Sequence, residues 1–449
     1  MTRKHAYGHP FFAKQIGGHY QIFVIPGQTS VFFPVNMGPK GRGFFQNLFL
    51  TGKKERKMFK KFFWGVVVCL MVTGPSTRAL ARADKTEYPV VFAHGMLGFD
   101  ELVGIDYFGN DYGVFVGDPC DGFLETSCNN EIDKKQQAFA ASVNPFQSSE
   151  HRGLELADQI ESYMATVGAE CVNIIGHSQG GMDARKAAKL LHDRRGRQVV
   201  KVLVSISAPH RGSPVGKGVL DRGPGGINAF LEFVVDYFVG PFLVLDVSDF
   251  TASMKSFVYD DYDPNDGVIT GARAFNNKYG IDDDCVGHYA SIITATQGNL
   301  NPILLALGLV APLDIDGDGW CEPSDEDTDN DGAAGCGDGD FEDGDDDGLV
   351  GINSQQMGYR LKYKKSWLFG TYFEEDGTTG YVADINRPDR VQSTSHSSVI
   401  DQDHLDVLGL GVIPYLIPDS FDEFQFYGDL IDYIADNEGV ESTGGWWFW

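Results

Sequence analysis

The chain has 449 residues, of which 42% are hydrophobic, enough for one large or two ordinary domains with a substantial core. Its formal net charge of −27 is unevenly distributed: residues 1–61 hold eleven Lys or Arg and one acid, whereas residues 84–449 hold 23 basic and 62 acidic side chains. Contacts to phosphates need Lys and Arg, so this balance argues against nucleic-acid binding and fits bound cations or solubility at high salt.

The first 83 residues contain a targeting signal. A short basic segment precedes an apolar run of 12 residues, Phe62 to Thr73, and two A-x-A sites follow within residues 79–83. This order predicts a secretory signal peptide over residues 58–83, because the apolar run is too short for a stable membrane span. We interpret residues 1–57 as a non-native or mis-assigned extension, with translation starting at Met58. The alternative is a membrane anchor with a cytoplasmic tail.

Secretion changes the interpretation of the cysteines. The part of the chain after the signal holds six of them, an even number in an oxidising compartment. Local spacing favours two disulfides, Cys120–Cys128 and Cys321–Cys336. Cys171 and Cys285 are then left over, and Cys171 also fits a buried thiol.

The first strand of the predicted sheet is the apolar run over residues 88–94, which stops at a Gly-rich turn. A strand that ends in such a turn, upstream of a nucleophile motif, is where an oxyanion hole is built, with the amide of Met96 as one donor. His94 is expected to be a turn and packing residue. Residues 109–150 are polar and Gly-rich and predict a loop with one disulfide.

The central motif is Gly176-His177-Ser178-Gln179-Gly180. Helical spacing of apolar residues over 151–167 leads into the apolar run 172–175, and a helix-forming run over 182–191 follows the motif. Strand, sharp turn and helix in this order form a nucleophile elbow, which presents Ser178 as the activated nucleophile. The amide of Gln179 is the second expected oxyanion donor.

Alternation of strands and helices defines the predicted fold class. Further buried strands are predicted over residues 199–206 and 290–295. Strands that alternate with helices predict an α/β fold with a mostly parallel, doubly wound sheet. Between the two, residues 228–247 predict a pair of short amphipathic helices, which suits a helical lid over about residues 213–260 that opens over a lipid surface. The alternative is an ordinary packed helix pair.

An acidic insert occupies residues 314–347, with sixteen Asp or Glu and no Lys or Arg. Two successive segments of the insert each have alternate carboxylates, a glycine at the bend and a closing aspartate, which is the ligand spacing of calcium-binding loops. The expected ligands are Asp314, Asp316, Asp318, Asp325, Asp327, Asp329, Asp331 and Asp338. The loops resemble secreted calcium repeats such as those of thrombospondin type 3, and the alternative is a solvated acidic loop.

The last third of the chain is predicted to return to regular structure. Residues 359–395 predict a β-hairpin plus a loop, with Asp376-Gly377 near the turn. Ser420 and Glu423 have the spacing of a capping box, which predicts the start of a helix with an apolar side.

With these pieces in order, the chain resembles the secreted bacterial triacylglycerol lipases of the Pseudomonas/Burkholderia true-lipase families. The resemblance is carried by the strings FAHGMLGFD, VNIIGHSQGG, SAPHRGS, DGLVG and HLD. It implies an α/β-hydrolase fold and a triad with Ser178 as nucleophile, Asp347 as acid and His404 as base. Asp345, Asp346 and His396 are the rival candidates.

The resemblance also implies a cofactor and a partner. Asp406 matches one of the two calcium-binding aspartates of these lipases, whose calcium braces the loop that carries the histidine. The second aspartate falls in the acidic insert and has no assigned position. The family disulfide needs a cysteine just after Gly351, where Ile352 and Asn353 stand, so the partner of Cys285 stays open. A membrane-bound foldase chaperone is implied as well.

Three functions follow from these features. The first is a secreted lipase that hydrolyses acylglycerols at a lipid interface through an acyl-enzyme. The second is a soluble carboxylesterase or polyester hydrolase in which the lid serves as a specificity cap. The third is a calcium-dependent surface or adhesion protein on a degenerate hydrolase scaffold, against which the ordered triad candidates speak.

Overall fold

The computed structural model describes residues 85–96, 98, 136–221, 223–225, 228, 247–259, 261–263, 268–296, 304, 346–366, 370–377, 380–387, 398–408 and 421–439. All of them belong to one unit that spans Ala79–Trp449. The predictions for the signal peptide, the two local disulfides, the paired calcium loops and the middle of the lid lie outside these residues. Within the described part of the chain, we find no helix with the length and apolar character of a membrane span.

The described strands form a mostly parallel sheet with the spatial order β10-β8-β7-β4-β3-β1-β2. Strands β2, β1, β3, β4, β7 and β8 pair in parallel, and β11 pairs in parallel with β7. Strands β9 and β10 pair antiparallel to β8. The bounds are β1 Val90–Ala93, β2 Ala138–Ala141, β3 Val172–His177, β4 Val200–Ile206, β7 Val286–Ala295, β8 Gly358–Ser366, β9 Gly370–Glu375, β10 Tyr381–Val382 and β11 Val399–Asp401.

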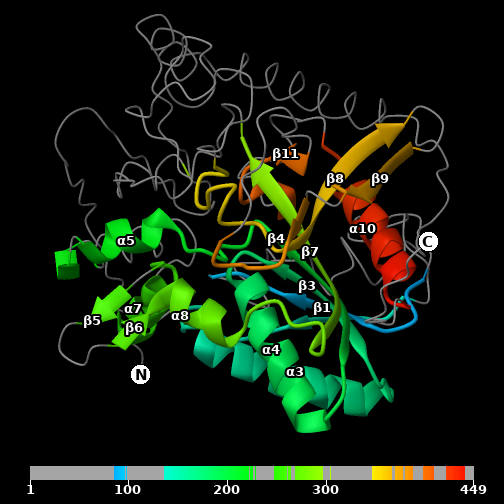
Figure 1. Ribbon diagram of the computed structural model, residues 1–449, viewed down its shortest axis with the longest axis horizontal. Helices are drawn as coiled ribbons and strands as arrows, with labels where there is room; N and C mark the ends of the chain where they lie inside the picture. Colours follow the sequence, from blue (N-terminus) through cyan, green and yellow to red (C-terminus); the bar gives the residue numbers. More distant parts are fainter. Residues whose placement is uncertain are drawn as a thin grey trace, which may run out of the picture. The chain divides into compact units, whose positions relative to one another are not determined.

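Helices cover both faces of this sheet, as a doubly wound fold requires (Figure 1). The described helices are α3 Ser149–Val167, α4 Gln179–Arg195, α5 Pro214–Asp221, α7 Val247–Ser256, α8 Gly271–Lys278, the 3₁₀ helix η6 Asp406–Leu408 and α10 Glu423–Asn437. A separate two-stranded ribbon pairs β5 Asp261–Asp263 with β6 Val268–Thr270. Figure 1 shows α3 and α4 on one side of the sheet and α10 on the other.

Alternation along the strands produces two apolar cores. In β1, Val90 and Phe92 belong to the core beneath α10, whereas Val91 and Ala93 belong to the core beneath α3 and α4. Successive side chains of a strand point to opposite faces, and here both faces are buried. The sequence of β1 is therefore a continuous apolar run, and this run is what predicted the strand.

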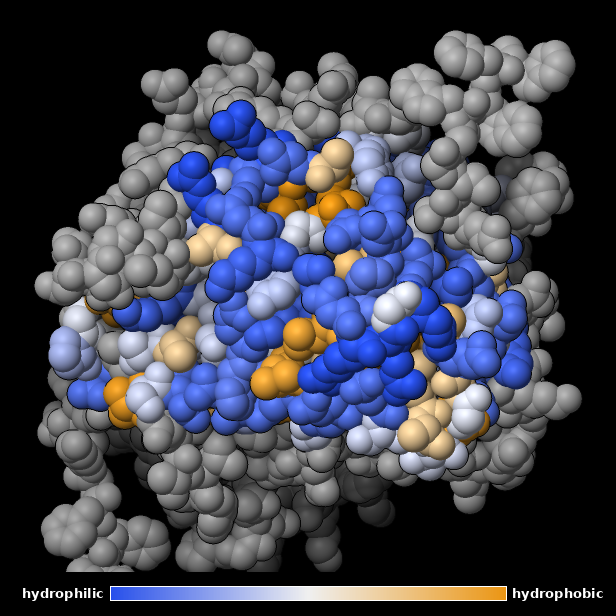
Figure 2. Space-filling view, turned by 60° about the horizontal axis from the view of Figure 1, so that its bottom comes forward, coloured by the Kyte–Doolittle hydropathy of each residue, from blue (hydrophilic) through white to orange (hydrophobic). Residues whose placement is uncertain are grey.

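The outer surface of α3 and α4 is polar. Figure 2 shows this side of the molecule as mostly hydrophilic, with small, scattered apolar patches. The exposed apolar residues of α3 are Leu154 and Val167, which are 41% and 38% exposed. Isolated apolar side chains of this kind are normal on a protein surface.

The predicted elbow strand, its flanking helices and the strand at 199–206 are confirmed, but three local predictions were wrong. Residues 138–141, expected in a loop, form the edge strand β2. The hairpin reverses between Ser366 and Gly370, which pair at the ends of β8 and β9, and Asp376-Gly377 follows β9 instead. The helix α10 is capped by the side chain of Asp422, which accepts from the amide of Gln425, so Ser420 is not the cap.

One carboxylate ties the end of α10 to the start of the sheet. Glu438, at the C-terminal end of α10, accepts hydrogen bonds from the amides of Glu87 and Tyr88 just before β1. It also accepts from the side-chain amide of Asn173 in β3, at 2.8 Å. The side chain of Asn173 in turn accepts from the amide of Val202, where the pairing of β3 with β4 shifts register.

Candidate active site

The elbow forms where β3 runs directly into α4. Ser178 has φ 54° and ψ −131°, a left-handed backbone conformation that an L-residue adopts at a strain of about 1–3 kcal/mol. Its amide donates to the carbonyl of Ile206 at 2.9 Å, which fixes the turn against β4. The side chain is 9% exposed. This is the strained strand–turn–helix geometry that the motif predicted.

Glycines surround Ser178 because backbone segments meet there at close range. A Cβ on Gly180 would lie 2.1 Å from the carbonyl oxygen of Ala93, the last residue of β1. A Cβ on Gly176 would lie 2.7 Å from the carbonyl oxygen of Gly180. Both distances are far below van der Waals contact, so only glycine lets β1 and the elbow approach this closely.

A buried arginine joins the turn after β1 to the elbow helix. Arg152 is fully buried and donates to the carbonyls of His94 and Gly95 at 2.6 and 3.1 Å. Its Nε donates to the carboxylate of Asp183 on α4 at 2.6 Å. Burial raises the pKa of Asp183 to about 6, and the charge of Arg152 opposes that shift. Arg152 thus connects the turn of Met96 with the helix that begins at the nucleophile.

His94 has the packing role that its sequence position suggested. It is 3% exposed, and burial lowers the pKa of its imidazole to about 3, with Arg152 adding to the effect. Its Nδ1 donates to the carbonyl of Gly95, and its Nε2 accepts from the amide of Val143. Both ring nitrogens are therefore bonded to main chain, and the ring is neutral.

Gln179 connects the elbow to two other segments. It is the first residue of α4 and is fully buried. Its side-chain amide donates to the carbonyl of Gln147 at 2.9 Å, and its side-chain oxygen accepts from Ser253 of α7 at 3.2 Å. Helix α7 lies within the predicted lid range, so this part of that range packs directly on the elbow.

Asp347 lies in a pocket of hydrogen-bond donors. Its Oδ1 accepts from the amides of Leu349 and Val350 at 3.0 and 2.8 Å. Its Oδ2 accepts from His404 Nδ1 at 2.8 Å and from Thr294 Oγ1 at 2.9 Å. The side chain is fully buried. These donors satisfy both oxygens of the buried carboxylate and fix its orientation toward His404.

His404 lies between this acid and the elbow. Its amide donates to the carbonyl of Asp347 at 2.8 Å, in addition to the side-chain bond. Its ring lies 4.8 Å from the ring of His177, the residue before the nucleophile, and His177 Nε2 donates to the carbonyl of His404 at 3.0 Å. Burial holds the pKa of His177 well below its usual range, so His177 is neutral. The structure therefore brings His404 to both Asp347 and the elbow.

Asp346, a rival candidate for the acid, lies next to Asp347 in the same loop. Asp346 is partly buried, and its carboxylate accepts from the amide of Gly348 at 2.5 Å within its own loop. It is Asp347, not Asp346, that carries the bond to His404. Asp345 and His396 lie outside the described residues.

Two of the six cysteines and one of the predicted calcium ligands lie within the described residues. Cys171 and Cys285 are buried free thiols, and burial raises the pKa of Cys285 to about 12. The other four cysteines and the ligands from Asp314 to Asp338 lie outside the described residues. Among the residues that are described, no group of three or more His, Cys, Asp or Glu side chains is arranged to hold a metal ion. Asp406 begins η6, and its amide donates to the side chain of Asp403 at 2.8 Å.

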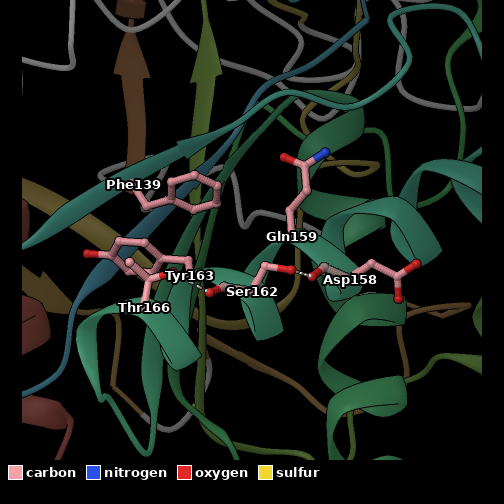
Figure 3. Close-up of a pocket in the computed structure, with 6 residues that line it drawn as sticks. All are labelled: Phe139, Asp158, Gln159, Ser162, Tyr163 and Thr166. Atoms are coloured by element: carbon pink, nitrogen blue, oxygen red, sulfur yellow. Dashed lines mark hydrogen bonds between the residues drawn. The ribbon is translucent and has the colours of Figure 1, made fainter.

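A surface hollow of about 400 Å³ lies on α3 and the edge strand β2. Figure 3 shows the ring of Phe139 beside that of Tyr163, with Ser162 bonded to its neighbours along the helix. Neither Ser178 nor the pair of Asp347 and His404 lines this hollow. It is therefore separate from the candidate active site.

Sequence reasoning missed the residues that support the site. Thr294, Gln355 and Arg152 stand in no recognisable motif. Thr294 is the penultimate residue of a predicted strand, and the carboxyl ends of parallel strands are where the sites of α/β proteins gather, so that position offered a signal. His177 stands inside the elbow motif, but nothing in the sequence showed that its ring reaches the loop of His404.

Comparison with known proteins identifies the relatives of this chain. It is 32% identical over 256 residues to the triacylglycerol lipase of Vibrio cholerae, which covers 53% of this chain and 73% of that protein. It is 29% identical over 172 residues to the triacylglycerol lipase of Burkholderia plantarii, which covers 37% of this chain and 42% of that protein. No protein-family model matches the chain.

Among solved structures, the chain is similar to lipase 1 from Pelosinus fermentans, with 15% identity, a TM-score of 0.42, and coverage of 78% of this chain and 99% of that one. The family rests instead on the sequence relatives, and the mostly parallel sheet with helices on both faces agrees with them. The chain belongs to the bacterial triacylglycerol lipase family, and it is a carboxylic ester hydrolase with the α/β-hydrolase fold.

Proposed function

We propose that the protein is a serine lipase in which Ser178, Asp347 and His404 form the catalytic triad. The observation that carries this proposal is the 2.8 Å bond from His404 Nδ1 to Asp347 Oδ2, beside the strained turn of Ser178. Because Nδ1 holds its proton toward the carboxylate, Nε2 is left with a lone pair for the serine proton. This is the tautomer that a general base needs.

The reaction has two halves. Ser178 Oγ attacks the ester carbonyl while His404 Nε2 takes its proton, and the amides of Met96 and Gln179 bind the oxyanion. The imidazolium then protonates the departing alcohol as the bond from carbon to that oxygen breaks. Water repeats the sequence on the acyl-enzyme, releasing the carboxylic acid and restoring Ser178. Asp347 keeps the imidazole oriented and stabilises its charge throughout.

Substitution of the triad tests this mechanism. Ser178→Ala should lower kcat on nitrophenyl esters by at least about 10³-fold, and Asp347→Asn should do so by about 10³- to 10⁴-fold. Asp346→Asn is the matched control and should stay within about threefold of wild type, because His404 bonds Asp347 and not Asp346. Retained activity in Ser178→Ala would contradict the mechanism.

The proposed substrates are long-chain acylglycerols at a lipid interface, and the two relatives are named triacylglycerol lipases. Helix α7 supports this choice, because Ser253 of α7 donates to the side chain of Gln179, the proposed oxyanion donor. Movement of the lid would therefore shift the position of Gln179. The test is the rate on a triglyceride as its concentration crosses the solubility limit. A rate that rises there supports a lipase, and a rate that stays level indicates a soluble esterase.

Calcium is proposed as the cofactor on the pattern of the acidic insert, and Asp406, two residues after the histidine whose loop the ion would brace, is the described candidate ligand. The described residues form no metal cluster of their own, and the two halves of the reaction use protein groups alone. Treatment with a chelator should lower the melting temperature and the activity together, and Ca²⁺ should restore both better than Mg²⁺. Insensitivity to the chelator would reduce the insert to a solvated loop.

Secretion and help from a foldase complete the proposal. Both rest on the signal-like segment over residues 58–83 and on the family to which the chain belongs. Expression in a host with and without a lipase foldase, followed by fractionation and N-terminal sequencing of the product, tests both. Cleavage after Ala81 or Ala83 is expected, and active enzyme made equally well without the foldase would remove that partner.

A further inference from the structure

Thr294, the penultimate residue of β7, is the side chain that bonds the proposed acid from inside the sheet. It is fully buried, and its Oγ1 lies 2.9 Å from Asp347 Oδ2. A second hydroxyl, Ser207 Oγ, lies 2.6 Å from Thr294 Oγ1 and is also fully buried. Ser207 directly follows β4, the strand that pairs with β7 (Figure 1). Two hydroxyls and the carboxylate therefore form one continuous buried chain.

The positions of the protons in this chain follow from its chemistry. An ionised carboxylate only accepts, so the proton of Thr294 points toward Asp347 Oδ2. The other acceptor near it, Gln355 Oε1, is farther away at 3.3 Å and already accepts from the amide of Thr294 at 2.8 Å. Thr294 Oγ1 must then accept from Ser207, whose proton has this one acceptor among the described residues. Each hydroxyl has one assigned direction, and the chain ends on Asp347.

Gln355 holds Thr294 in place from the opposite side. Its amide nitrogen donates to the carbonyls of Thr294 and Val350, each at 2.8 Å, and approaches Asp347 Oδ2 at 3.4 Å. The main chain of Thr294 is thus bonded in both directions by one buried side chain. Its hydroxyl cannot move away from the carboxylate without breaking these bonds.

Ser207 stands in a strained conformation that brings its hydroxyl to this chain. Its φ is 52°, and apart from Ser178 it is the only non-glycine residue in the described part of the chain with a positive φ. Its amide donates to the carbonyl of Ile292 in β7 at 3.1 Å, which fixes the residue against the neighbouring strand. Strained residues persist where the surrounding structure over-determines them, and they cluster at functional sites.

We propose that Thr294 is a positioning residue for the ester hydrolysis, which acts through Asp347 and is itself oriented by Ser207; the inference rests on the proposed triad. Asp347 Oδ2 receives His404 and Thr294 together, so the threonine hydroxyl fixes the rotation of the carboxylate that aims His404 at the serine. Without it, the two amide donors still hold Oδ1, but the long 3.4 Å approach of Gln355 is the side-chain contact left beside His404 on Oδ2, so that oxygen can turn away from the imidazole.

The test compares variants that remove the hydroxyl with variants that keep it. Thr294→Val should lower kcat on a nitrophenyl ester by about 10- to 100-fold with KM within about twofold, since the missing bond is to a charged group. Thr294→Ser keeps the hydroxyl and should stay within about threefold of wild type. Ser207→Ala removes the second link only and should lower kcat by about threefold.

Thr86→Val is the matched control. It removes a buried threonine hydroxyl that bonds Tyr88 and Gln136, away from the site, and it should leave kcat unchanged.

A double-mutant cycle separates this role from plain stability and from failure of the triad. If Thr294 acts through Asp347, then Thr294→Val should change kcat by less than about twofold in the Asp347→Asn background. A normal kcat in Thr294→Val beside an inactive Asp347→Asn would overturn the inference and leave the triad intact. So would an equal loss in Thr294→Ser, or additive losses in the cycle. An active Asp347→Asn would overturn both.

Discussion

The candidate active site has two sides that are held together in different ways. The nucleophile side, from Ser178 and Gln179 to the turn of Met96, is fixed by close approach of backbone segments around glycines and by Arg152. The acid–base side, Asp347 and His404, is fixed by side-chain hydrogen bonds from Thr294, Gln355 and His177. Steric contact on one side tolerates almost no change in shape, whereas the bonds on the other side can be removed one at a time. The substitutions below probe this difference, from the largest expected effect to the smallest.

Removal of Arg152 should damage the nucleophile side most. Arg152→Met leaves Asp183 buried without its cation and removes the donor that the carbonyls of His94 and Gly95 share. Breaking a buried pair in this way costs about 3–5 kcal/mol of stability. Chemical denaturation measures the loss, and Asp183→Leu in the same chain should recover part of it. A variant as stable as wild type would show that the pair does not hold the turn.

A single methyl group at Gly180 should be nearly as damaging. The Cβ of Gly180→Ala would meet the carbonyl oxygen of Ala93 at 2.1 Å, and forced overpacking of this kind costs about 3 kcal/mol. Gly196→Ala is the control: that glycine has a positive φ of 64°, unlike Gly180, and no atom lies within 4 Å of the added carbon. The control should lose only about 1 kcal/mol. Equal melting temperatures for the two variants would contradict the steric account.

On the acid–base side, loss of one amide should reduce activity more than it reduces stability. Gln355→Leu removes the partners of the Thr294 main chain, which costs about 1–3 kcal/mol, and should lower kcat about 10-fold with KM unchanged. Gln356→Leu serves for comparison, because that buried residue bonds Asn353 and Arg360 instead. It should lose stability but keep kcat. Steady-state kinetics beside a melting curve separates the two outcomes.

The smallest effect is expected from an ion pair at the rim of the nucleophile side. Burial alone would raise the pKa of Glu150, but bonds from Lys186, Lys278 and Tyr279 outweigh it and lower that pKa from 4.5 to about 2. A lowered acid pKa stabilises the fold above pH 4.5, and this contribution is lost as the pH falls from 4.5 toward 2. Because the side chain is 39% exposed, we expect only about 1 kcal/mol.

Glu150→Gln tests this pH dependence. The variant should be less stable than wild type at pH 7, and the difference between the two should shrink as the pH is lowered through this range. Unfolding measured at several pH values, at low and high salt, gives the comparison. A difference that stays constant with pH would assign the effect to packing.

The same contrast explains what the sequence could and could not reveal. The elbow is local: an apolar strand, a serine between glycines and a helix are consecutive, so residues 172–191 were predicted correctly, with the helix beginning at Gln179. Asp347 and His404 were found only through resemblance, because 56 residues separate them and their contact depends on the fold. The edge strand β2 was missed because AFAA has no alternating pattern.

Other misses have equally local causes. Two residues at the start of α10 could each serve as the cap, and the aspartate beside the helix prevailed over the serine two positions earlier. Asp376-Gly377 has the composition of a hairpin turn, yet strand β8 is nine residues long and its register with β9 places the reversal earlier. Arg152 gave no signal because most of its bonds go to main-chain carbonyls, which any sequence supplies, and its carboxylate partner Asp183 lies 31 positions away.

The carboxylate of Glu438 has a consequence for how the molecule opens. It joins the last described helix to the amides of Glu87 and Tyr88 and to the side chain of Asn173 in the nucleophile strand. The end of α10 therefore cannot fray without releasing the entry to β1 and loosening β3. In hydrogen exchange, the end of this helix, the start of β1 and the strand that leads to Ser178 should behave as one cooperative unit. The lifetime of the folded nucleophile strand would then depend in part on Glu438, which lies 260 positions after Ser178 in the chain.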